Sequence, residues 1–101
     1  MEYDEEVKRM IGGNIPAILS CLTSHRPLHR ACGAMFAGLY HVKDDAVVNT
    51  IIRMKKDLTA IDGYTVGDFA VASLDVLGVE KYTGDRQEMK GLIATGFKFF
   101  E

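Results

Sequence analysis

The stretch YTVGDFAVASLDVLG, residues 64–78, carries the clearest helix start and stop signals in the sequence. Thr65 is a good N-cap residue, and Asp68 three positions on can bond back to the open helix end, as in a capping box. The apolar residues recur at helical spacing and continue around most of the circumference, which is typical of a helix buried on nearly all sides. Gly78 can adopt the left-handed conformation that ends a helix. We therefore predict that residues 64–78 form a central helix, more buried than the others.

Weaker helical patterns lie on both sides of this stretch. They are a short amphipathic start that ends near Ile11, a helix capped by Asn14 that runs to about Thr23, a helix from Pro27 to Tyr40, a helix capped by Asp44, and a last helix capped by Asp85 with Glu88 completing a second capping box. No segment alternates strictly and no Asn-Gly hairpin signal is present, so we expect no β structure. The fold class that follows is all-α, with about five or six helices packed as antiparallel hairpins.

The spacing of apolar residues predicts which side of each flanking helix is buried. The residues expected to point inward are Ile15, Ile18, Leu19 and Leu22, then Leu28, Ala31, Cys32, Met35, Phe36 and Leu39, then Val47, Val48, Ile51, Ile52 and Met54, and finally Met89, Leu92, Ile93, Gly96, Phe97 and Phe100. In the helix at 27–40 the opposite side carries the small residues Gly33, Ala34, Ala37 and Gly38. We expect another backbone or a ligand to approach closely there.

The composition sets bounds on class and location. The chain has 101 residues, 48% of them hydrophobic and 26% charged, as is ordinary for one globular domain. Its net charge of −2 provides no global basic field for nucleic acid. No apolar run reaches the roughly 20 residues needed to cross a bilayer, and the acidic start lacks a signal-peptide pattern. We expect a cytoplasmic protein with no membrane partner and with reduced cysteines.

The sequence contains a loose internal repeat. A shift of 38 residues places Leu28 on Val66, Cys32 on Ala70, Phe36 on Leu74 and Leu39 on Leu77. Two antiparallel helices repeated at roughly 35 to 45 residues are the signature of an α-solenoid. LDVLG at 74–78, and more loosely MFAGL at 35–39, resembles the second helix of HEAT-like repeats.

That resemblance implies repeat units at 14–43 and 44–82, with residues 85–101 as a capping helix. It implies a short HEAT-like α-solenoid that binds other macromolecules, and it implies no chemistry. A compact, non-repetitive helical bundle is the alternative fold.

The densest group of chemically versatile side chains is Cys21, His25, His29 and Cys32. These residue types bind Zn²⁺ tetrahedrally, but paired ligands in structural zinc sites are usually closer in sequence, and Pro27 divides the group between two helices. We favour buried structural cysteines beside surface histidines, and therefore expect no metal site.

The turn SHRPLHR, residues 24–30, places His25, Arg26, His29 and Arg30 near a helix N-terminus. Backbone N–H groups and positive side chains together favour anions at such a place. We expect the turn to be exposed and to bind an anion or an acidic partner, and a plain solvated loop is the alternative. Arg53, Lys55 and Lys56 form a second, dispersed basic group without an aromatic platform, so we expect no nucleic-acid partner.

No nucleophile motif, glycine-rich phosphate loop or carboxylate pair is present, so no catalytic residue and no cofactor is expected. Asp75 is the unusual residue of the central helix, and it marks either a narrow solvent stripe or a groove with His41 or Tyr40. Phe97, Phe99 and Phe100 lie on more than one side of the last helix, which favours a homodimer through that helix.

The function that follows is a non-catalytic protein-interaction module, such as an adaptor, an inhibitor or an immunity-type protein. The alternatives are a small-ligand, anion or metal-binding protein that uses the turn between Cys21 and Cys32, and a weak nucleic-acid binder.

Overall fold

A computed structural model describes residues 5–61, 63–82 and 88–95, and it confirms the all-α fold class. In chain order the elements are α1 (Glu5–Lys8), α2 (Ile15–Leu22), α3 (Pro27–Leu39), α4 (Asp45–Arg53), the 3-10 turn η1 (Met54–Lys56), β1 (Ala60–Ile61), β2 (Tyr64–Thr65), α5 (Val66–Val76) and α6 (Glu88–Thr95). Every helix in these ranges is too short or too polar to cross a bilayer.

Three of the predicted helix caps are confirmed. Asn14, Asp44 and Thr65 each accept a hydrogen bond from the backbone N–H three positions on. At the start of α5 the capping box is complete, because the Asp68 N–H donates to Thr65 Oγ1 at 3.1 Å and the Thr65 N–H donates to Asp68 Oδ2 at 2.9 Å. Gly78 follows the C-cap of α5 with a φ of +75°, the left-handed conformation that glycine favours.

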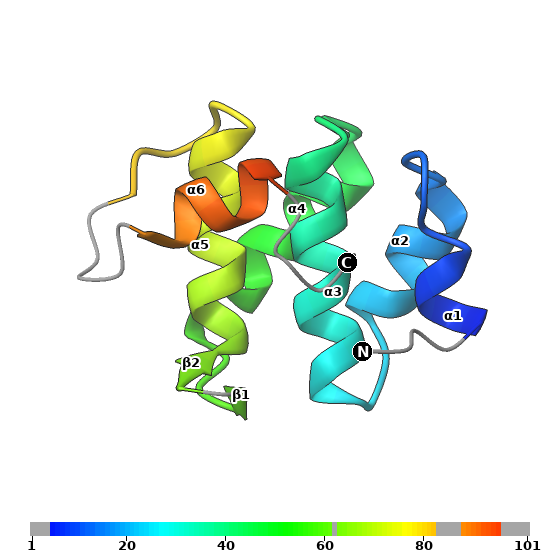
Figure 1. Ribbon diagram of the computed structural model, residues 1–101, viewed down its shortest axis with the longest axis horizontal. Coiled ribbons are helices and arrows are strands. Elements are labelled where there is room, and N and C mark those ends of the chain that lie inside the picture. Colours follow the sequence, from blue (N-terminus) through cyan, green and yellow to red (C-terminus); the bar gives the residue numbers. More distant parts are fainter. Residues whose placement is uncertain (1–4, 62, 83–87, 96–101) are drawn as a thin grey trace.

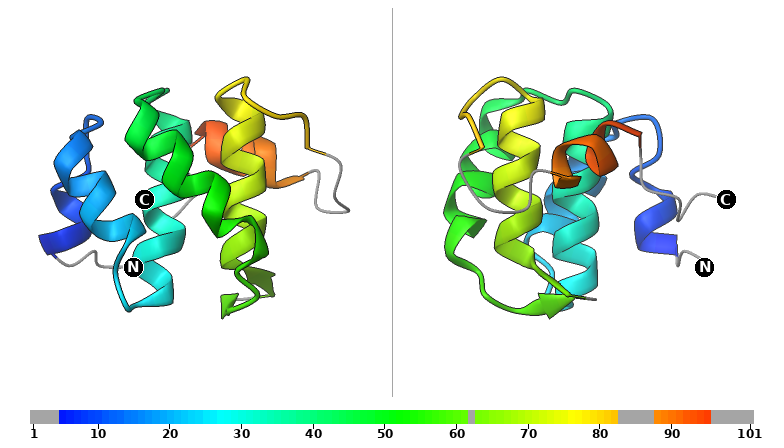
Figure 2. Two further views of the ribbon diagram at one scale, coloured as in Figure 1. Left: turned by 180° about the vertical axis from the view of Figure 1, so that it is seen from behind. Right: turned by 60° about the vertical axis from the view of Figure 1, so that its left-hand side comes forward.

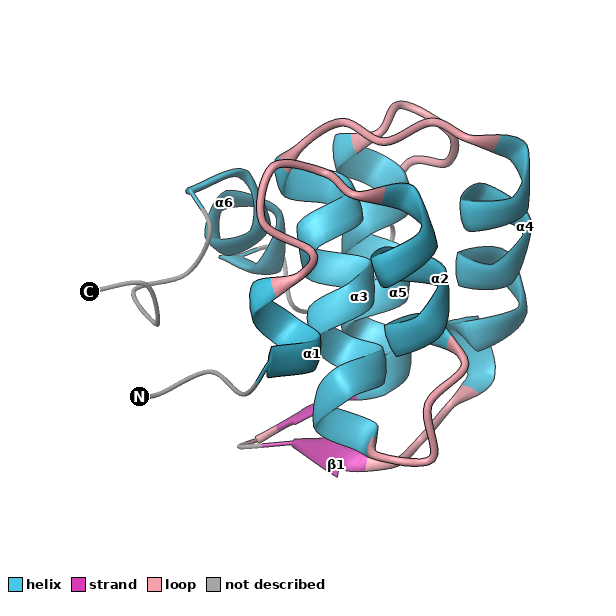
Figure 3. Cartoon of the chain, turned by 90° about the vertical axis from the view of Figure 1, so that its right-hand side faces the viewer, coloured by secondary structure: helices cyan, strands magenta, loops and turns pink. Residues whose placement is uncertain are grey.

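The helices form two antiparallel hairpins, α2–α3 and α4–α5, that lie side by side (Figure 1). The first helices of the two hairpins, α2 and α4, pack on each other, and so do the second helices, α3 and α5. The second helices run parallel, so both begin at the end of the molecule where β1 and β2 lie (Figure 2). Loops gather at the two ends of the helices (Figure 3). At the sides, α1 packs on α2 and α3, and α6 packs on α5 and α3.

Two helices, rather than one, form the centre of the molecule. None of the residues of α5 is fully exposed, but α3 is at least as buried, since every residue from 31 to 38 is buried. The prediction of a single most buried helix is therefore incomplete. The small residues of α3 explain its position, because they allow neighbours on two sides to approach closely. A Cβ at Gly33 would lie 3.0 Å from Leu22 Cγ, and a Cβ at Gly38 would lie 2.6 Å from Ile93 Cγ2.

The prediction of no β structure is wrong for one short hairpin. β1 and β2 pair antiparallel, with Ala60 opposite Thr65 and Ile61 opposite Tyr64. The connecting sequence is Asp-Gly, which favours two-residue hairpin turns as Asn-Gly does, and Gly63 has a φ of +86°. The hairpin leads directly into the N-cap of α5.

Three apolar side chains that the spacing places in the core are exposed: Ile15, Leu28 and Ile52. The buried side of α4 differs from the predicted one. Thr50 is buried together with Val47 and Ile51, whereas Ile52 is exposed. Met89 and Ile93 of α6 are buried as predicted. Asp85, Phe97, Phe99 and Phe100 lie outside the described residues.

The buried hydroxyl of Ser73 has a measurable consequence. Ser73 Oγ is buried between α5, α3 and α6 and has no hydrogen-bond partner among the described residues. An unsatisfied buried hydroxyl costs free energy that an alanine does not. We expect Ser73→Ala to raise the free energy of unfolding by about 1 kcal/mol in urea titration. A loss of stability would show that the hydroxyl has a partner in the native protein.

Candidate interaction surface

The turn of residues 23–26 joins α2 to α3 at the end of the molecule that carries the β hairpin. Ser24 Oγ accepts a hydrogen bond from the Arg26 N–H at 3.1 Å and lies 3.3 Å from His29 Nδ1. Arg26 is the N-cap residue of α3, and its side chain makes no capping hydrogen bond. The predicted exposure holds for His25 and Arg26 but is wrong for His29, which is only 6% exposed.

Arg30 connects this turn to the other hairpin. Its Nη1 donates to the carbonyl oxygens of Ser24 and His25, at 3.0 and 3.1 Å. Its Nε donates to Asp57 Oδ2 at 3.0 Å, and its Nη2 lies 3.5 Å from Thr59 Oγ1. The guanidinium therefore binds residues of its own chain, and we correct the prediction that Arg30 is an open anion contact.

Asp57 anchors the loop that runs from η1 to β1. Its Oδ1 accepts a hydrogen bond from the Thr59 N–H at 3.0 Å, and its carbonyl oxygen accepts one from the Gly67 N–H at 2.7 Å. Burial raises the pKa of Asp57, but hydrogen bonds from Thr59 and the charge and hydrogen bond of Arg30 outweigh this effect and lower the pKa below 3.8. The carboxylate form is therefore part of what joins the two hairpins.

The direction of this pKa shift predicts how stability depends on pH. Because the pKa of Asp57 is lower in the folded protein, its contribution is present above about pH 4 and is lost as pH falls through the folded value. We expect Asp57→Asn to lower the free energy of unfolding by about 1–2 kcal/mol at pH 7. Urea titrations of both proteins between pH 7 and pH 3 should show the difference shrinking at the acid end. A difference that is constant with pH would contradict the role of the charge.

A shallow pocket of about 330 Å³ lies beside the turn. Polar residues from α1, from α2, from the turn and from the first helical residues of α3 line it: Glu6, Ser20, Ser24, His25, Arg26 and His29. Arg26 and the histidines suit an anionic group, while Glu6 opposes one. Glu6 Oε1 lies 3.7 Å from Arg9 Nη1, an exposed pair that holds the carboxylate weakly.

The structure does not bring the four cysteine and histidine residues together as ligands. Cys21 is buried in α2 and its Sγ lies 3.7 Å from the Glu6 carbonyl oxygen, while Cys32 is buried in α3 and His25 is exposed. Within the described ranges, no three histidine, cysteine, aspartate or glutamate side chains are placed to share a metal ion.

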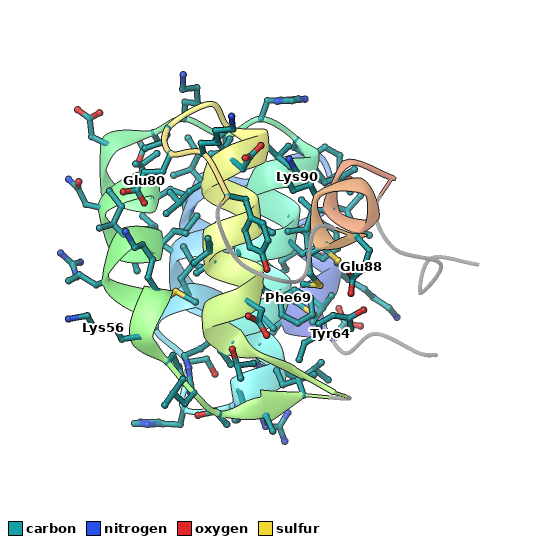
Figure 4. All side chains as sticks on the ribbon, turned by 90° about the vertical axis from the view of Figure 1, so that its left-hand side faces the viewer. Lys56, Tyr64, Phe69, Glu80, Glu88 and Lys90 are labelled. Carbon is teal, nitrogen blue, oxygen red and sulfur yellow. The ribbon has the colours of Figure 1, made fainter. Side chains whose placement is uncertain are left out.

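Asp75 links α5 to the segment that follows it and lies near α6. Asp75 does not line a groove with His41 or Tyr40, because its Oδ2 accepts the Tyr82 N–H at 2.6 Å and lies 3.8 Å from Lys90 Nζ. Figure 4 shows Lys90 on α6 and Glu80 in the segment that follows α5.

The second basic group, Arg53, Lys55 and Lys56, makes separate contacts in the structure. Lys55 Nζ contacts both carboxylate oxygens of Glu80, at 2.8 and 3.1 Å, and Arg53 Nη2 lies 3.3 Å from Thr50 Oγ1. Lys56 is exposed at the edge of the molecule (Figure 4). The three residues therefore do not form one basic patch.

The residue that the sequence analysis overlooked is Leu58. It is 81% exposed, although both of its neighbours, Asp57 and Thr59, contact Arg30. The signal was a single leucine that follows the basic end of a helix and belongs to no apolar stripe. Because Arg30 also donates to the carbonyl oxygens of Ser24 and His25, it links the backbone on both sides of Leu58 to the turn that carries His25 and Arg26. We call the exposed side chains His25, Arg26 and Leu58 the Arg30 surface.

Comparison with family models, with curated proteins and with solved structures finds no match for this chain.

Proposed function

We propose that the protein is a non-catalytic interaction module, an adaptor, inhibitor or immunity-type protein, that binds an acidic macromolecular partner through the Arg30 surface. One observation carries the proposal: Arg30 and Asp57 fix the backbone of both hairpins at this end, while His25, Arg26 and Leu58 remain exposed. A surface ordered before binding loses little conformational entropy when a partner arrives.

The arrangement of the hairpins supports a short HEAT-like scaffold as part of this proposal. Like helices of α2–α3 and α4–α5 pack on each other, as they do when repeats stack. Such scaffolds bind macromolecules along surfaces to which neighbouring units both contribute, and the Arg30 surface has that property. A cytoplasmic location fits the two buried cysteines, Cys21 and Cys32, which are not joined in a disulfide. The homodimer through Phe97, Phe99 and Phe100 stays a prediction, and sedimentation of the wild type beside Phe99→Glu tests it.

Differential capture tests the main proposal. The wild type, Arg26→Glu and Lys43→Glu are each immobilised and exposed to an extract of the source cells at moderate ionic strength. Lys43 is exposed and follows the C-terminal end of α3, so its reversal is a matched control at the opposite end. We expect a protein that the wild type and Lys43→Glu retain and that Arg26→Glu loses about tenfold or more. Equal retention by all three proteins would refute the Arg30 surface as the contact.

A second candidate function rests on the pocket beside the turn. His25, Arg26 and His29 line a volume that suits a small anion. Titration with inorganic phosphate, followed by NMR of the backbone amides, should shift the signals of residues 25–29. Unshifted amides up to millimolar phosphate would remove this candidate.

A further inference from the structure

We draw no further inference here: the strongest candidate, the shallow pocket of about 260 Å³ at the C-terminal end of α5, carries nothing because its two carboxylates, Asp75 and Glu80, already bind Tyr82, Lys90 and Lys55 of this chain.

Discussion

Leu74→Ala is expected to lower the free energy of unfolding by about 2–5 kcal/mol, enough to unfold a marginally stable domain. Leu74 is fully buried in α5, the helix that packs on α3, α4, η1 and α6. The truncation removes apolar burial and leaves a cavity that several rigid neighbours cannot close, and both effects act in the same direction. Urea titration monitored by circular dichroism measures the loss.

The same substitution at an exposed leucine is the control. Leu58 is 81% exposed, so Leu58→Ala should change the free energy of unfolding by less than about 0.5 kcal/mol. Equal and small effects at Leu74 and Leu58 would contradict the central position of α5.

Gly67→Ala is expected to cost about 3 kcal/mol, although it adds only one methyl group. A Cβ at Gly67 would lie 2.6 Å from the Lys55 carbonyl oxygen and 2.9 Å from that of Asp57. Both are backbone atoms, and the Asp57 carbonyl oxygen also accepts the Gly67 N–H at 2.7 Å. To admit the methyl group, the start of α5 must move away from η1, which breaks this hydrogen bond and disturbs the loop that Arg30 holds.

Gly91 provides the matched comparison, because it is also a helical glycine, but outside its own helix no atom of the described residues lies within 4 Å of an added Cβ. Gly91→Ala should leave stability unchanged or raise it by up to about 1 kcal/mol, as helix propensity predicts. If Gly67→Ala proves as mild as Gly91→Ala, the close approach of α5 and η1 does not exist in solution.

Features that depend on neighbouring residues were predictable from the sequence. Thr65, Asp68 and Gly78 define the ends of α5 through contacts within one helical turn, and Asn14 and Asp44 do the same for α2 and α4. The Asp-Gly sequence before Tyr64 is a hairpin signal of the same kind as Asn-Gly, and the prediction of no β structure considered only Asn-Gly.

Features that depend on distant residues were not predictable from local patterns. Arg30 and Asp57 are 27 residues apart, and nothing near either residue indicates that the two hairpins bring them together. The burial of His29 and the exposure of Leu58 follow from the same packing. As a result, of the four residues predicted to bind an anion or partner, His25 and Arg26 are exposed, His29 is buried and Arg30 is half-buried.

Crosslinking from position 58 tests the central claim, that the Arg30 surface is where a partner binds, most directly. A photoreactive phenylalanine analogue replaces Leu58 in one variant and Ile11 in another, and both are irradiated in the source cells. We predict one major crosslinked protein from position 58, absent from position 11 and lost when Arg26→Glu is added to the position-58 variant. Crosslinks of the same proteins from both positions, or a product that Arg26→Glu does not diminish, would contradict the account.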